Sequence, residues 1–87
     1  MYVIITYDVD KKRVYKVCKK LREYLIWTQN SVFEGPIGKG KLTQCMHELD
    51  HIINPQYDSI YLYQVNNQNH MKKTVFGREK GFDDLFL

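Results

Sequence analysis

Asp8 is the residue of this chain that is best placed to bind a metal ion. It follows an unbroken apolar run from Met1 to Tyr7, so its carboxylate is expected where a buried strand leaves a sheet. A turn or helix-cap role is the simpler interpretation of such an Asp. Mg²⁺, however, prefers oxygen ligands, keeps several of its waters and needs few protein carboxylates. Two copies of Asp8 that face each other across a dimer axis would be sufficient for a site.

A second pattern, "HELDH" from His47 to His51, matches the H-E-x-x-H motif of zinc proteases. That chemistry needs both imidazoles on one helical face, a third ligand, and Glu48 as base to a zinc-bound water. The residues expected to point to the core from this helix are Leu42, Met46, Leu49 and Ile53. His47 and His51 therefore belong to the solvated side, which argues against a zinc site.

Positive charge is concentrated in one segment, although the net charge of the chain is only +3. Of the thirteen Lys and Arg residues, seven lie between positions 11 and 22: Lys11, Lys12, Arg13, Lys16, Lys19, Lys20 and Arg22. A charged run is usually a solvated helix face, but a single sign of charge also favours binding to phosphates through counterion release. The residues expected to contact nucleic acid are Lys12, Arg13, Lys16 and Lys19. The sequence contains no Walker loop, dinucleotide fingerprint or Ser-His-Asp arrangement.

The stretch "WTQNSVFEG", Trp27 to Gly35, sets polar residues between aromatic ones. Gln29, Asn30 and Ser31 either turn the backbone between two short strands or face a ligand that needs donors and acceptors. The stretch itself is predicted to be either one bent strand or a hairpin folded at Asn30.

The elements that must position these residues follow from periodicity. Strands are predicted for Met1 to Tyr7, covered on both faces, and for Ser59 to Val65; helices are predicted from a cap at Asp10 to about Ile26, and from Leu42 to Ile53 before Asn54-Pro55. Asn66 to Lys73 is predicted to be a loop, and Thr74 to Leu87 an apolar tail docked on a sheet edge. This order predicts an α+β fold, an antiparallel sheet with both helices on one face, in the split βαβ arrangement.

Length and composition indicate one small domain, residues 1–87, that is marginal as a monomer. The seven Tyr residues exceed what so small a core can use, which favours a homodimer. Cys18 and Cys45 form no CxxC pair and are expected to be reduced thiols in the core. The first ten residues match neither a signal peptide nor a membrane span, so we expect a cytoplasmic protein without membrane association.

The motifs Y-D-V at residues 7–9 and Q-x-S-V-F-E at residues 29–34 resemble the small CRISPR-associated endonuclease family, the smaller of the two core proteins of spacer acquisition. The basic helix, the helix ending in "IINP" and the strand "DSIYLY" occur in the matching order. The resemblance extends from Met1 to about Val65, with looser agreement in the tail.

The resemblance implies a ferredoxin-like βαββαβ core, residues 1–66, with an additional C-terminal strand. Residues 74–87 would pack on the other subunit of a homodimer. Asp8 would be the catalytic and metal-binding residue, with Mg²⁺ or Mn²⁺ as cofactor, and Tyr7, Ser31 and Phe33 would line the cleft. The implied activity is a metal-dependent endonuclease on RNA or DNA in CRISPR adaptation. The alternative is a non-catalytic dimeric scaffold that bridges the larger CRISPR integrase and binds duplex DNA.

Overall fold

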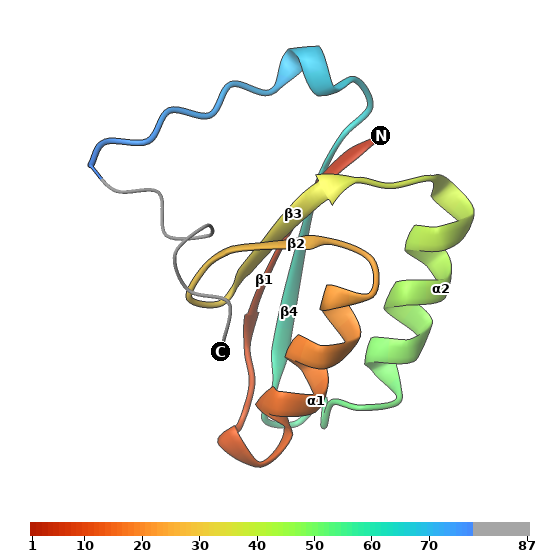
Figure 1. The fold of residues 1–87 in the computed structure, drawn as a ribbon. Helices are drawn as coiled ribbons and strands as arrows, with labels where there is room; N and C mark the ends of the chain where they lie inside the picture. The colour runs from red at the N-terminus through yellow and green to blue at the C-terminus, as the bar shows by residue number, and fades with distance from the viewer. Residues whose placement is uncertain (78–87) are drawn as a thin grey trace.

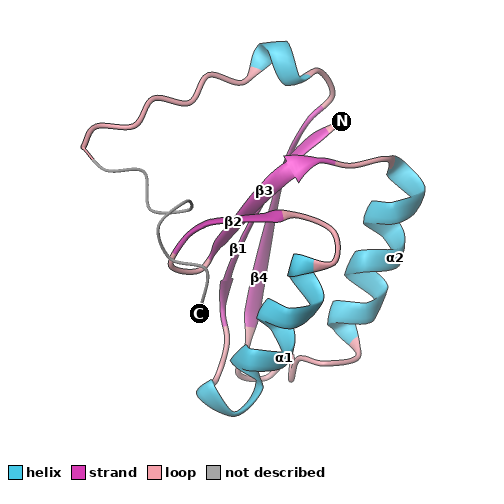
Figure 2. Cartoon of the chain, viewed as in Figure 1, coloured by secondary structure: helices cyan, strands magenta, loops and turns pink. Residues whose placement is uncertain are grey.

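The computed structural model describes residues 1–77. In chain order its elements are β1 (Tyr2–Asp8), α1 (Lys11–Arg22), β2 (Ile26–Gln29), β3 (Val32–Pro36), α2 (Lys39–Asp50), β4 (Ser59–Val65) and the single 3₁₀ turn η1 (Gln68–His70). Figures 1 and 2 show these strands as one sheet, with α1 and α2 side by side on the same face of it.

The sheet has the strand order β2-β3-β1-β4, and every neighbouring pair is antiparallel. β1 therefore lies inside the sheet between β3 and β4, and the two βαβ-type halves interleave. This is the ferredoxin-like βαββαβ arrangement, so the predicted fold class and the position of the helices are confirmed.

Local sequence explains where each helix begins and which face it buries. The Asp10 carboxylate accepts a hydrogen bond from the backbone N–H of Lys12, at 2.9 Å, and so caps α1 as predicted. The buried residues of the two helices are Val17, Cys18 and Leu21 on α1 and Leu42, Cys45 and Leu49 on α2. The second helix ends at Asp50, earlier than the predicted Ile53, and a tighter turn follows in which the Ile52 N–H donates to the Leu49 carbonyl.

The stretch from Trp27 to Ile37 is a hairpin rather than one bent strand. Asn30 lies in its turn with φ of 38°, a left-handed conformation that Asn tolerates better than most residues. The indole N–H of Trp27 donates to the Asn30 carbonyl at 2.9 Å, and Thr28 donates to the Val32 carbonyl at 3.2 Å. These contacts favour the turn interpretation of the polar residues in this stretch.

The hydrophobic core lies between the helices and one face of the sheet. Its strand residues are Val3, Ile5, Tyr7, Trp27 and Phe33. Cys18 and Cys45 are free thiols buried in this core, as predicted, and burial raises the pKa of the Cys45 thiol to about 11.

The second face of the sheet carries neither helix, so the cover predicted for this side of β1 does not come from α1 or α2. Tyr2, Ile4 and Thr6 are only half-buried there. Tyr61 and Tyr63 of β4 share this face by the strand register and are 55% and 58% exposed. We call this surface the open face. The apolar run of β1 thus reflects apolar residues on both faces, of which the helices cover one.

Beyond β4 the described chain is mostly irregular. Lys73 forms an ion pair with Glu34, a β3 residue on the open face, so this segment returns toward the sheet. Thr74 to Gly77 form no strand, and Phe76 is 93% exposed. The docking predicted for the rest of the tail, residues 78–87, falls outside the described residues. Within residues 1–77, neither helix has the length and apolar character needed to cross a membrane.

Candidate metal and nucleic-acid site

Asp8 is the last residue of β1 and is exposed. Its neighbours Val3, Ile5 and Tyr7 alternate onto the helix side, so Asp8 belongs to the open face with Ile4 and Thr6. Its register partner is Ser59, the first residue of β4. The carboxylate therefore stands at one end of the open face, away from the helices and in contact with solvent.

Asp8 is the residue predicted to bind a cation, and its carboxylate is accessible at this place. Within residues 1–77, no three His, Cys, Asp or Glu side chains come close enough together to hold a metal ion. An exposed oxygen donor suits Mg²⁺ or Mn²⁺, which retain much of their hydration. Asp8 is thus an exposed oxygen donor for such an ion and is not part of a preformed cluster of ligands within residues 1–77.

Tyr7 and Phe33 are buried in the single chain, and their place beside a cleft between subunits stays a prediction. Both are core residues on the helix side of the sheet, with ring centroids 6.3 Å apart. The Tyr7 hydroxyl lies 2.7 Å from the Cys18 sulfur. Burial, with this hydrogen bond, raises the pKa of Tyr7. Strand alternation explains why Asp8 is exposed and Tyr7 is not, because the two residues must face opposite sides of the sheet.

Ser31 is the third residue expected at the cleft, and it lies next to the end of β1. Its side chain is half-buried, and its carbonyl accepts a hydrogen bond from the Tyr7 N–H at 3.2 Å. The hairpin turn therefore holds Tyr7, the residue before Asp8, through a backbone hydrogen bond. The polar side chains of the turn remain at the surface.

The basic helix presents most of its charge to solvent. Lys12, Lys16 and Lys19 are exposed, as phosphate contacts require. Arg13 is different: its guanidinium makes a two-pronged ion pair with Asp58, with Nε to Oδ2 at 2.6 Å and Nη2 to Oδ1 at 3.0 Å. Sequence reasoning missed Asp58 because its partner lies 45 residues away in the chain.

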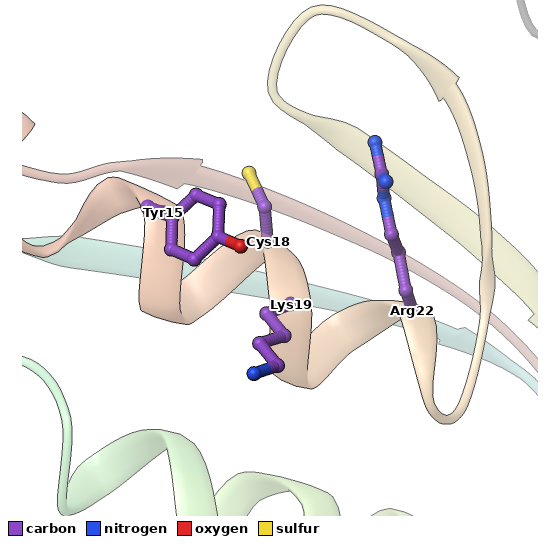
Figure 3. Close-up of a pocket in the computed structure, with 4 residues that line it drawn as sticks. All are labelled: Tyr15, Cys18, Lys19 and Arg22. Carbon is purple, nitrogen blue, oxygen red and sulfur yellow. The ribbon is translucent and has the colours of Figure 1, made fainter. Parts of the chain in front are cut away.

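A small hollow of about 100 Å³ lies along α1 and is shown in Figure 3. It is lined by Tyr15, Cys18, Lys19 and Arg22. Tyr15 is 68% exposed, and an exposed ring among cations suits stacking with an unpaired base. Sequence reasoning did not place Tyr15 or Arg22 at a site. The signal that could have found them is their i, i+4, i+7 spacing with Lys19, which puts all three residues on one helical face.

Of the "HELDH" residues, Leu49 packs in the core and Glu48 makes contacts outside α2. Glu48 accepts a hydrogen bond from the Tyr24 hydroxyl and lies 3.7 Å from the Lys20 ammonium. The Tyr24 bond lowers the pKa of Glu48 and raises the pKa of Tyr24 to about 12. His47 and His51 are exposed, and His51 Nδ1 lies 2.9 Å from the His47 carbonyl. The Glu48 carboxylate is thus already held by Tyr24 and Lys20.

Comparison with known proteins shows to which family this chain belongs. The family model described as CRISPR associated protein Cas2 matches residues 1–73, which include β1 with Asp8, the hairpin and the basic helix. The chain belongs to the Cas2 family. Its resemblance to the small CRISPR-associated endonucleases is thereby confirmed.

Individual Cas2 proteins match along most of their length. A protein of Thermodesulfovibrio yellowstonii, named CRISPR-associated endoribonuclease Cas2 3, is 49% identical over 79 residues, which cover 91% of this chain and 90% of that protein. The CRISPR-associated endoribonuclease Cas2 of Thermotoga maritima is 42% identical over the whole of both chains. A solved structure, described as the crystal structure of cas2, superposes with a TM-score of 0.84 at 38% identity and covers 100% of this chain and 98% of its own. Cas2 proteins therefore share this fold.

Proposed function

We propose that this chain is a metal-dependent endonuclease of CRISPR adaptation, which hydrolyses phosphodiester bonds at a pair of Asp8 residues in a homodimer. The observation that carries the proposal is the position of Asp8, exposed at the end of β1 on the open face. The relatives of Thermodesulfovibrio yellowstonii and Thermotoga maritima are named endoribonucleases, which supports RNA as a substrate. The proposal also includes DNA as a substrate.

The open face supports dimerisation as part of this function. Ile26, Tyr61 and Tyr63 are exposed large side chains on it, and a second copy is the occupant that would bury the same residues on both sides of a two-fold axis. An isologous contact of this kind also places two equivalent Asp8 residues about one axis. Residues 74–87 would add to the same contact.

Each protein group has a defined task in hydrolysis. The two Asp8 carboxylates would hold Mg²⁺ or Mn²⁺ through oxygen. Such a bound ion supplies charge stabilisation to a phosphoryl oxygen and lowers the pKa of a bound water. Lys12, Lys16 and Lys19 would neutralise phosphates of the strand and hold it in place. Hydrogen bonding of Ser31 to Tyr7 would keep the end of β1 from moving.

A scaffold is the second candidate function, and a specific observation favours it. Asp8 lies on the open face, whereas α1 lies on the other face of the sheet. The lysines of α1 proposed to bind nucleic acid are therefore on the other side of the sheet from the carboxylate proposed to cleave it. In the scaffold proposal the dimer bridges copies of the larger CRISPR integrase and holds duplex DNA without cleaving it.

A cleavage assay with a matched control tests the nuclease proposal. Single- and double-stranded RNA and DNA are incubated with Mg²⁺, Mn²⁺ or chelator and with wild-type, Asp8→Asn or Asp50→Asn protein. Asp50 is an exposed carboxylate at the end of α2, so its variant controls for loss of surface charge. We expect cleavage that needs metal, survives Asp50→Asn and falls to background in Asp8→Asn. Cleavage that survives Asp8→Asn indicates a contaminating nuclease and contradicts the proposal.

Spacer insertion with the larger integrase separates the two functions. If the Asp8→Asn dimer still supports insertion, the scaffold function is the physiological one. If insertion stops while the dimer and the complex remain intact, the Asp8 pair carries the function.

A further inference from the structure

Asp58 is a buried carboxylate, and the site described above gives it no role. Its side chain is fully buried. It accepts hydrogen bonds from the N–H of Asp10 at 2.9 Å, from the N–H of Asn54 at 2.8 Å, and from Arg13 Nε and Nη2 at 2.6 and 3.0 Å. Four donors occupy the acceptor positions of the two oxygens. Asp58 therefore has no oxygen left over for a metal ion.

These four bonds join three separate parts of the chain. Asp10 belongs to the connection between β1 and α1, Arg13 to the first turn of α1, and Asn54 to the turn that leads into β4. The bidentate contact depends on the planar fork of an Arg side chain, which fixes direction as well as distance. A Lys at position 13 would supply charge without that geometry.

Asp8 lies between the points that Asp58 anchors. Asp10 is two residues after Asp8 in the chain, and its N–H is bound by Asp58. Ser59, the register partner of Asp8 on β4, directly follows Asp58. The end of β1 and the start of β4 are thus both tied to one carboxylate. A shift of the backbone that follows Asp8 would therefore stretch the bond from the Asp10 N–H to Asp58.

From this arrangement we infer that Asp58 and Arg13 are positioning residues, which hold Asp8 in the orientation that the dimer needs for a divalent cation. The inference rests on the proposed metal site at Asp8. It also changes the role expected for Arg13, since two of its guanidinium N–H groups, on Nε and Nη2, donate to Asp58 and fix the direction of the side chain. Lys12, Lys16 and Lys19 then carry the phosphate contacts without Arg13.

The test compares Arg13→Lys, Asp58→Asn and, as a matched control, Lys12→Gln in the full-length protein. Mn²⁺ affinity is measured by the loss of the free-ion signal in electron paramagnetic resonance. RNA binding is measured as a function of salt, and kcat and KM are measured separately. Arg13→Lys keeps the charge, so any loss it causes comes from geometry. Lys12→Gln removes a charge that makes no contact with Asp58.

We expect Arg13→Lys and Asp58→Asn to weaken Mn²⁺ binding and lower kcat by about tenfold or more, the usual range for residues that orient a metal ligand. KM for RNA and the salt slope should stay unchanged in Arg13→Lys. Lys12→Gln should give the opposite pattern, with a lower salt slope and unchanged Mn²⁺ affinity. A wild-type Mn²⁺ affinity in Arg13→Lys, or a salt slope lowered as in Lys12→Gln, overturns the inference.

Amide hydrogen exchange at Asp8 and Asp10 tests the anchoring by itself. Faster exchange at both positions in Arg13→Lys, with the rest of the sheet unchanged, supports the positioning role even if the wild-type protein binds no metal. Unchanged exchange overturns it. If Asp58→Asn does not fold, Arg13→Lys carries the test alone. Failure of the proposed function is recognised separately, because wild-type protein would then neither bind Mn²⁺ nor cleave.

Discussion

Tyr7 and Asp8 are neighbours in the chain, and strand alternation gives them opposite environments. Tyr7 packs with Phe33 in the core and reaches Cys18, whereas Asp8 is exposed on the open face. The same contrast separates Lys12 from Arg13 on α1. Lys12 is exposed, and Arg13 is turned into a network with Asp58. Two residues that are adjacent in the chain, and that share a motif or a charge, therefore have different chemical roles.

Single lysines of α1 give a prediction at the residue scale. Replacing Lys12, Lys16 or Lys19 with Gln should lower the slope of log affinity against log salt by roughly one unit each, because each phosphate contact releases about one counterion. Preference among nucleic-acid sequences should not change. Equilibrium binding from low to physiological salt measures both. Unchanged slopes in all three variants would mean that this helix face is only a solvated surface.

Two connections between elements, the hairpin turn and the network at Asp58, hold the strand that carries Asp8. The turn at Asn30 brings Ser31 onto the Tyr7 N–H, and Asp58 holds the segment that follows Asp8. The end of β1 is therefore supported on both sides.

The hairpin turn can be tested through Asn30, whose φ of 38° disfavours β-branched residues. Asn30→Val should lower the free energy of unfolding by about 1–2 kcal/mol, the usual strain of a left-handed conformation. Asn30→Gly is the matched control and should stay close to the wild-type stability, because Gly adopts positive φ without strain. Chemical denaturation measures all three. Equal stability of the Val and Gly variants would exclude this turn geometry.

The Asp58 network predicts how stability depends on pH. Hydrogen bonds from Arg13 hold the pKa of Asp58 well below its usual range. A lowered pKa in the folded state contributes stability that is fully present above the unfolded pKa, near 3.9, and is lost as the pH falls through the folded value. The stability difference between wild type and Asp58→Asn should therefore be constant near neutral pH and shrink below about pH 4. Asp50→Asn serves as the control. A difference that does not vary with pH would contradict the ion pair.

Sequence reasoning predicted the elements better than their contacts. The cap at Asp10 and the alternation in β4 are local patterns, and both are present in the structure. The choice between hairpin and bent strand at Asn30 stayed open because both need the same polar residues. Asp58 was missed because its role depends on Arg13, far away in the sequence. The apolar pattern of β1 predicted cover on both faces but not its source, because an apolar strand face has the same composition whether a helix or a second chain covers it.

At the scale of the whole molecule, the sheet divides the chain into two surfaces. α1 and α2 cover one face and close the core (Figure 1). The open face exposes Tyr61 and Tyr63 and has Asp8 at its end. A chain of 87 residues has little core with which to offset that exposure. The proposed function therefore needs a homodimer, in which the two Asp8 carboxylates would form a pair.

The number of Mn²⁺ ions bound per dimer is the most direct test of this account. Light scattering gives the mass in solution, and titration with Mn²⁺ gives the number of ions per chain in the same sample. We predict a dimer that binds about one Mn²⁺ for each pair of chains, since Asp8 from both protomers is needed for one ion. Asp8→Asn should remain a dimer and lose that ion, while Asp50→Asn keeps it. A stable monomer at micromolar concentration, or Mn²⁺ binding that survives Asp8→Asn, would contradict the paired site.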